Sequence, residues 1–280
     1  MRAFPIVAVL WLTGCLSVDS AIYGAVREAS YELDPRGGSS EETVTADRVE
    51  PAWIAVNDKV TLGAAYLKGS VQPPQAYVIF FHGRGGNLDT AFGRAKRWAN
   101  LGYDVLVFDY RGWGASSDVT PTEEGIMEDS RAARAFLLQR IGDANASRLV
   151  YYGQSLGAAI ATELAQAQPP SALVLESAFA SIQAFVNDDT GMDFPADFIS
   201  ECHWDVAGRI RDVHVPLLLV AGTADETNRA EFSSQIYGNA NEPKKLVVVE
   251  GAGHGNVPET MGPQQYRELM NGFIGGAIGP

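Results

Sequence analysis

The chain has 280 residues and a formal net charge of −13, and hydrophobic residues make up 46% of it. This length and apolar content suit one large folded domain with a sizeable core. The acidic balance argues against nucleic acid as a partner and against a broad attraction to anionic membrane surfaces.

The first residues have the pattern of a secretory signal. Arg2 supplies a positive start, and residues 3–12 form an apolar stretch of the length that signal peptides use. A helix that spans a bilayer needs about 20 apolar residues, so this stretch is too short for one. Cys15 ends the sequence Leu-Thr-Gly-Cys, which resembles a bacterial lipobox. We therefore expect a signal peptide over residues 1–14.

The lipobox resemblance implies that Cys15 is lipidated, becomes the mature N-terminus and ties the protein to a membrane. Several acyl chains would give stable anchoring, since one chain alone binds only marginally. Leu16 follows the cysteine, and by the same resemblance a residue other than aspartate there favours the outer membrane of a bacterial cell envelope, facing the periplasm. A signal peptide without lipid and a cytosolic protein with an apolar N-terminus are the alternatives.

A spacer is expected between the lipid and the domain. Residues 34–42 (DPRGGSSEE) have a linker-like composition, so we assign residues 15–47 to this spacer, with some local structure. Cys202 is the second of two cysteines, and lipidation of Cys15 would leave it without a disulfide partner. No motif surrounds Cys202, so we expect it to pack in the fold; a bridge to Cys15 in an oxidising compartment is the alternative.

From residue 48 onward the hydrophobic pattern predicts strands that alternate with helices. An antiparallel hairpin opens the domain, and the later alternation indicates a mostly parallel sheet covered on both faces by helices. This is an α/β domain over residues 48–280. The predicted strands cover residues 49–56, 59–67, 76–81, 103–108, 147–152, 172–175, 215–222 and 245–250, and the predicted helices cover residues 89–100, 122–139, 158–165, 229–238 and 263–274.

The most informative motif is GQSLG at residues 153–157, which fits the nucleophile-elbow pattern GxSxG. A predicted strand precedes it and a predicted helix follows it, which is the context that the motif needs. The two glycines let backbones approach closely around a sharp turn, so Ser155 points its hydroxyl out of the fold.

A serine hydroxyl is a weak nucleophile near neutral pH and needs a base, which in turn needs an orienting acid. Asp225 lies just past strand 215–222, and His254 lies on a glycine-rich loop just past strand 245–250. Sites of open parallel sheets form outside the carboxyl ends of the strands, where all three residues are placed. We therefore predict Ser155 as nucleophile, His254 as base and Asp225 as acid.

A glycine-rich turn at residues 82–87 (HGRGGN) follows the apolar strand 76–81. Such a turn presents backbone N–H groups to a developing oxyanion. We predict that the N–H groups of Arg84 and Leu156 form the oxyanion hole, each worth about 3 kcal/mol in the transition state. His82 is expected to support this turn through hydrogen bonds.

Taken together, these pieces resemble the α/β-hydrolase superfamily, in its small, minimally capped serine-hydrolase branch. The resemblance covers about residues 50–275 and implies an eight-stranded, mostly parallel sheet. Arg84 departs from the family, where asparagine or an apolar residue is common, which affects the substrate that this side chain meets. The matching motifs stand at residues 81–87 (FHGRGGN), 109–116 (DYRGWGAS), 153–157 (GQSLG), 175–179 (LESAF), 222–226 (GTADE) and 253–254 (GH).

The resemblance also implies a short cap at about residues 180–213. Its aromatic side chains, Phe185, Phe194 and Phe198 among them, either pack on the scaffold or line an acyl pocket. Some members of the superfamily carry the triad acid after an earlier strand, which makes Glu176 the alternative to Asp225.

The expected function is hydrolysis of carboxylic esters or thioesters through an acyl-enzyme. Expected substrates are small-molecule or lipid acyl esters, such as lysophospholipids. No cofactor is expected, and no His, Cys, Asp or Glu cluster has metal-ligand spacing. A serine peptidase or amidase on the same fold, and a non-catalytic envelope lipoprotein that only binds, are the alternatives.

Overall fold

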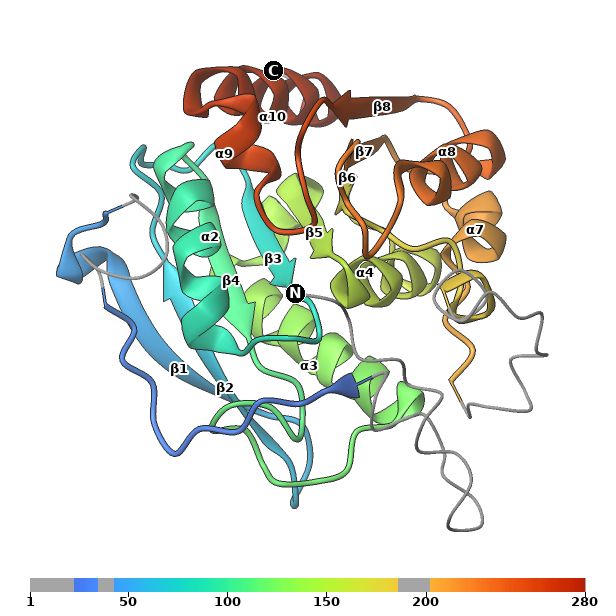
Figure 1. The fold of residues 1–280 in the computed structure, drawn as a ribbon. Coiled ribbons are helices and arrows are strands. Elements are labelled where there is room, and N and C mark those ends of the chain that lie inside the picture. Colours follow the sequence, from blue (N-terminus) through green and yellow to red (C-terminus); the bar gives the residue numbers. More distant parts are fainter. Residues whose placement is uncertain (1–22, 35–42, 186–201, 280) are drawn as a thin grey trace, which may run out of the picture.

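The computed structural model describes residues 23–34, 43–185 and 202–279. Eight strands form one sheet, which confirms the predicted α/β fold class (Figure 1). The strands are β1 (Val49–Ala55), β2 (Thr61–Leu67), β3 (Tyr77–Phe81), β4 (Asp104–Phe108), β5 (Leu149–Gln154), β6 (Ala172–Glu176), β7 (Leu217–Gly222) and β8 (Lys244–Val249).

Within the sheet the strand order is β1-β2-β4-β3-β5-β6-β7-β8. The hairpin β1–β2 is antiparallel, and β2 pairs antiparallel with β4. All remaining pairs are parallel, so the carboxyl ends of β3 to β8 meet at one edge of the sheet.

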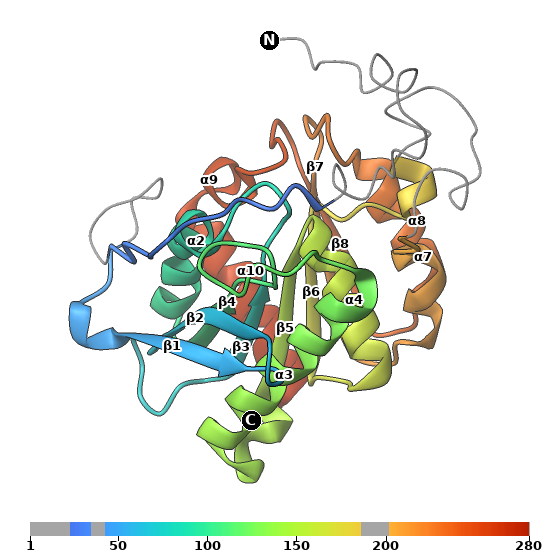
Figure 2. The same cartoon turned by 90° about the horizontal axis from the view of Figure 1, so that it is seen from below.

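Helices cover both faces of the sheet (Figures 1 and 2). Alternate residues of one strand serve the two cores: Val78 and Phe80 of β3 pack toward α2, α9 and α10, whereas Ile79 and Phe81 pack toward α3, α4, α7 and α8. This period-two alternation is what a sheet buried on both faces requires. The helices are α2 (Leu88–Asn100), α3 (Glu123–Ile141), α4 (Leu156–Ala167), α7 (Val206–Arg209), α8 (Ala230–Asn239), α9 (Val257–Met261) and α10 (Pro263–Ile278).

Local sequence signals explain several element ends. Thr122, the residue before α3, caps the helix by accepting a hydrogen bond from the Gly125 N–H at 3.1 Å. The strand predicted from residue 147 begins only at Leu149, because a 3₁₀ helix (Asp143–Arg148) occupies the preceding residues. Short helix α9, which follows the His254 loop, was not predicted.

The described part of the N-terminal region, residues 23–34, lies against the domain, although it falls within the predicted spacer. Tyr23 and Leu33 are buried, and the backbone N–H groups of Glu32 and Leu33 donate to the Asp89 carboxylate at the start of α2. The segment is drawn in dark blue in Figures 1 and 2. The predicted signal peptide and Cys15 lie outside the described residues. Within the described ranges, no helix has the length and apolar character to cross a membrane.

Candidate active site

Ser155 stands at the sharp turn between β5 and α4. Its backbone has φ 55° and ψ −118°, a left-handed conformation that residues other than glycine rarely adopt. The neighbouring glycines make this turn possible: a Cβ on Gly157 would lie 1.9 Å from the Phe81 carbonyl oxygen, and one on Gly153 would lie 2.3 Å from the Gly157 carbonyl oxygen. The structure thus forms the strained elbow that the GxSxG motif predicts.

We expect Gly157→Ala to lower the free energy of unfolding by at least about 3 kcal/mol, the upper end of ordinary overpacking, because the methyl group meets backbone that cannot rotate away. Urea denaturation measures the loss. Gly272→Ala is the matched control, since Gly272 lies inside α10 with open space around its Cβ position. That change should be neutral or stabilise by about 0.5–1 kcal/mol. Equal stability of the two variants would contradict the packing argument.

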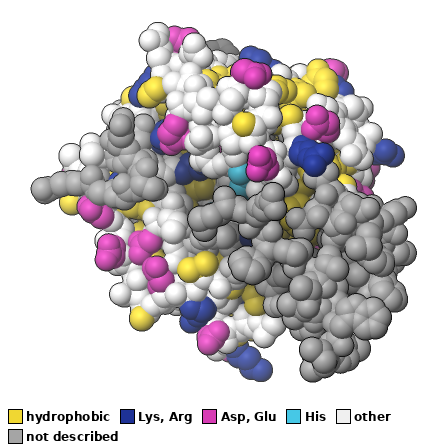
Figure 3. Space-filling view, viewed as in Figure 1, with side chains coloured by type: hydrophobic (Ala, Val, Ile, Leu, Met, Phe, Trp, Pro, Cys, Tyr) yellow, Lys and Arg dark blue, Asp and Glu magenta, His cyan; other side chains and the backbone are white. Residues whose placement is uncertain are grey.

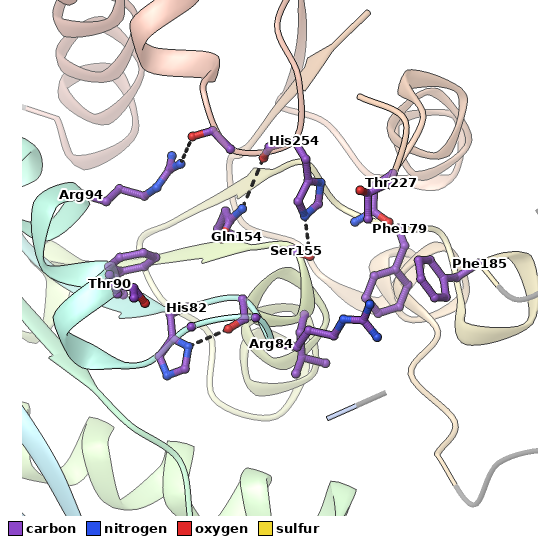
Figure 4. A pocket seen from close by; sticks show the side chains of 18 of the residues that line it. His82, Arg84, Thr90, Arg94, Gln154, Ser155, Phe179, Phe185, Thr227 and His254 are labelled. Carbon is purple, nitrogen blue, oxygen red and sulfur yellow. Dashed lines mark hydrogen bonds between the residues drawn. The ribbon is translucent and has the colours of Figure 1, made fainter. Parts of the chain in front are cut away.

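The structure brings the three predicted catalytic side chains together at the carboxyl edge of the sheet. Figure 4 shows the His254 ring pointing toward Ser155. His254 Nε2 lies 3.0 Å from Ser155 Oγ. On the other side of the ring, His254 Nδ1 lies 3.1 Å and 3.0 Å from the two carboxylate oxygens of Asp225. The carboxylate is an acceptor, so Nδ1 carries a proton and Nε2 is left to accept the serine proton.

Asp225 is held in place by its own loop. Its Oδ1 atom accepts hydrogen bonds from the backbone N–H groups of Thr227 at 3.0 Å and Asn228 at 2.8 Å. Burial alone would raise the pKa of Asp225, but the hydrogen bonds from His254 and the Asn228 N–H outweigh it and lower the pKa below the ordinary value. The carboxylate therefore stays ionised beside His254.

The turn after β3 is fixed by hydrogen bonds to its carbonyl groups. The Tyr110 hydroxyl donates to the His82 carbonyl at 3.0 Å, and the Trp113 indole donates to the Arg84 carbonyl at 3.1 Å. The His82 ring contacts the carbonyl between them, since Nδ1 lies 2.7 Å from the Gly83 oxygen. His82 thus supports the turn, as expected from the sequence.

A cavity of about 430 Å³ opens beside Ser155. Arg84 and Leu156, the predicted oxyanion-hole residues, both line it. Leu156 is the first residue of α4, so its N–H has no acceptor within the helix, and the positive end of the helix dipole lies at this point. Figure 4 shows the Arg84 side chain extending toward Phe185, with the guanidinium carbon 5.8 Å from the ring centre.

Glu176, the alternative acid, does not contact His254. Its buried carboxylate pairs with Arg94 of α2 and accepts a hydrogen bond from the Tyr152 hydroxyl at 3.0 Å. Arg94 also donates through Nη2 to the carbonyl of Gly255 at 2.9 Å, so it ties the residue after His254 to α2 (Figure 4). No sequence motif marks Arg94, because only the fold brings it together with Glu176, 82 positions away.

Residues in the described part of the predicted cap show both expected roles, lining the cavity and packing on the scaffold. Phe185 lines the cavity and packs against Phe179, with ring centres 6.3 Å apart. Cys202 is buried and contacts the Tyr23 hydroxyl, consistent with a packing residue. Phe194 and Phe198 lie outside the described residues.

Charged side chains of both signs are interspersed on the face shown in Figure 3, among the residues that the structure describes. The same described residues contain no group of three or more His, Cys, Asp or Glu side chains that could hold a metal ion. The charged side chains that line the cavity include two arginines, Arg84 and Arg94.

Comparison with known proteins places this geometry in a family. Residues 72–203 match the family model described as serine aminopeptidase, S33. The uncharacterized protein Rv2307c of Mycobacterium tuberculosis is 33% identical over 277 residues, which cover 98% of this chain and 95% of that protein. The α/β-hydrolase domain-containing protein WAV2 of Arabidopsis thaliana is 28% identical over 210 residues, covering 68% of this chain and 66% of the relative.

A solved structure shows the same fold. The esterase Pf2001 of Pyrococcus furiosus superposes with a TM-score of 0.69 at 19% identity, covering 89% of this chain and 99% of the esterase. At this identity the likeness concerns the fold alone. The sheet order, the elbow motif and these relatives agree, and the chain belongs to the α/β-hydrolase family.

Proposed function

We propose that this α/β-hydrolase cleaves carboxylic esters or thioesters through an acyl-enzyme formed on Ser155. The observation that carries the proposal is the unbroken series of contacts from Asp225 through His254 to Ser155, at the wall of a cavity large enough for a small acyl substrate. The same three groups in this relation perform acyl transfer on several unrelated folds.

In the proposed reaction, Ser155 Oγ attacks the substrate carbonyl carbon while His254 Nε2 takes the hydroxyl proton. The N–H groups of Arg84 and Leu156 donate to the resulting oxyanion. The tetrahedral intermediate then collapses, the bond to the alcohol or thiol breaks, and His254 returns the proton to that leaving group. Water repeats the same steps on the acyl-enzyme, which releases the carboxylic acid and regenerates the Ser155 hydroxyl.

The cavity lining favours esters over aminoacyl amides, the second candidate suggested by the S33 family description. An aminopeptidase has to bind the free ammonium group of its substrate, which a carboxylate does best. No aspartate or glutamate is among the described residues that line the cavity. Phe179, Ile182 and Phe185 instead form an apolar wall that suits an acyl chain.

The proposed setting of this activity is the bacterial cell envelope, with Cys15 as the lipid-bearing residue. The support is the signal-peptide and lipobox pattern of residues 1–15. In that setting, acyl esters released from membranes are the proposed natural substrates.

Labelling with a fluorophosphonate, which captures activated serines, tests the proposal. We expect the native chain to be labelled and Ser155→Ala to remain unlabelled, because the probe bonds to Oγ. p-Nitrophenyl butyrate and alanine p-nitroanilide then compare an acyl ester with an aminoacyl amide, and we expect the ester to be the better substrate.

Failure of the folded native chain to react with the probe would refute the hydrolase assignment and favour a binding protein. Equal labelling of native protein and Ser155→Ala would refute Ser155 as the nucleophile. Faster turnover of the anilide than of the ester would replace the esterase assignment with an aminopeptidase.

A further inference from the structure

The N-terminal segment 23–34 reaches the active site through the turn that follows β4. It pairs with this turn as a short parallel bridge between Arg27 and Gly114, in which the Glu28 N–H donates to the Gly114 carbonyl at 3.0 Å. Two tyrosines of the segment then make side-chain contacts within the turn, at residues 109–116. The segment therefore contacts the same turn, residues 109–116, whose Tyr110 and Trp113 side chains hold the glycine-rich turn at residues 82–87. The turn at residues 82–87 is called the oxyanion turn below.

Tyr31 makes the first of these contacts. Its hydroxyl donates to Asp109 Oδ2 at 2.7 Å and accepts from the Ala115 N–H at 2.9 Å. The other carboxylate oxygen, Asp109 Oδ1, lies 3.1 Å from Nε2 of the buried His82 ring in a close polar contact that is not a hydrogen bond. Asp109 and His82 are 0% and 2% exposed, so water does not screen this contact. Because Nδ1 donates its proton to the Gly83 carbonyl, the contact between Nε2 and the carboxylate is attractive in the ring form that carries a proton on both nitrogens. Tyr31 thus holds the carboxylate that faces the His82 ring.

The second contact is made by Tyr23. Its ring packs edge-on against Trp113, with centres 6.1 Å apart, and the Trp113 indole donates to the Arg84 carbonyl. Gly24 also lies beside the Arg84 side chain, since a Cβ there would be 3.8 Å from Arg84 Cδ. Two separate routes therefore lead from the segment to consecutive carbonyls of the oxyanion turn, one through Asp109 and His82 to Gly83, the other through Trp113 to Arg84.

We propose that segment 23–34 is a working part of the active site, and that Tyr31 is a positioning residue that orients the oxyanion turn through Asp109 and His82. The inference rests on the proposed hydrolase function. Each of these carbonyls belongs to the peptide unit whose N–H is carried by the next residue, so fixing the Gly83 carbonyl fixes the direction of the Arg84 N–H. A change in that direction weakens an oxyanion donor without altering the acyl pocket.

Tyr31→Phe in the full chain tests this role, with Tyr66→Phe as the matched control. The Tyr66 hydroxyl also donates to a buried aspartate of β4, but Asp104 lies at the opposite end of that strand from the site. We expect Tyr31→Phe to lower kcat on p-nitrophenyl butyrate by about 10-fold, less than the 10²–10³-fold cost of removing an oxyanion donor. We expect KM to change by less than twofold. The inhibition constant of a trifluoromethyl ketone, which mimics the tetrahedral intermediate, should rise by the same factor as kcat/KM falls.

Amide hydrogen exchange supplies a readout that does not require turnover. Amides in peptides covering residues 82–86 should exchange faster in Tyr31→Phe than in the native chain. In Tyr66→Phe their exchange rate should be the same as in the native chain. Equal kcat and equal exchange in the two tyrosine variants would overturn the proposal, whatever their melting temperatures. A native chain that neither hydrolyses esters nor reacts with a fluorophosphonate would instead overturn the proposed function, while the exchange data would still report the link between Tyr31 and the turn.

Discussion

Asp225→Asn is expected to lower kcat for ester hydrolysis by roughly 10⁴-fold, with little change in KM or in the melting temperature. The reason lies in the backbone N–H donors of the loop that holds Asp225. Oδ1 accepts from the N–H groups of Thr227 and Asn228, so the amide oxygen of an asparagine is expected to take that place. The amide NH₂ then faces His254 Nδ1, which forces the ring proton onto Nε2. In that tautomer His254 cannot accept the proton of Ser155.

Steady-state kinetics on p-nitrophenyl butyrate measure this loss, and Asp205→Asn is the matched control. Asp205 also accepts a backbone hydrogen bond through Oδ1, from the Gly208 N–H at 2.8 Å, but it caps α7 away from the cavity. Its change to asparagine, which is an equally good cap, should leave kcat unchanged. A loss smaller than tenfold in Asp225→Asn would contradict the assigned role of Asp225.

Arg94→Met is expected to lower the free energy of unfolding by about 3–5 kcal/mol, the usual result of breaking a buried ion pair on one side. The Glu176 carboxylate is 0% exposed and would lose its cation, and Arg94 itself is only 14% exposed. Burial alone would lower the pKa of Arg94, but the neighbouring Glu176 carboxylate outweighs burial and raises that pKa. Arg94 therefore stays charged. Chemical denaturation with urea measures the change.

The double variant Arg94→Met and Glu176→Leu separates stability from catalysis. Removing both charges should recover much of the lost stability, because no uncompensated charge remains buried. The kcat should stay as low in the double variant as in Arg94→Met, because in both variants the Gly255 carbonyl lacks the hydrogen bond from Arg94 that fixes the loop of His254. Full recovery of kcat in the double variant would show that Arg94 acts on stability alone.

The sequence predicted the framework and the position of the candidate triad. The sheet and most helices follow from hydrophobic periodicity over ten or so residues, which is a local property. Ser155 follows from a five-residue motif, and Asp225 and His254 follow from their places after strands. Each of these predictions needs only a short window of sequence and a general rule on where sheets form sites.

The contacts that the sequence did not predict join residues far apart in the chain. Arg94 and Glu176 carry no motif, and their pairing depends on how α2 packs on the sheet. Tyr31 lies within residues 15–47, which the sequence assigns to a spacer, and its contact with Asp109 spans 78 positions. Helix α9 has five residues, too few to show a helical period. Long-range polar contacts of this kind follow from tertiary packing, which no local pattern encodes.

The attachment of segment 23–34 to the domain also limits the length of the linker between the domain and a lipid on Cys15. Tyr23 is held against Trp113, and Cys15 stands eight residues before it. An extended chain covers at most about 3.6 Å per residue, so a lipid on Cys15 would keep Tyr23 within about 29 Å of the bilayer surface. Because Gly24 lies beside Arg84 at the cavity wall, the cavity would remain at a similar distance from the bilayer surface. An enzyme tethered in this way would draw its substrates from the thin layer next to the lipid head groups.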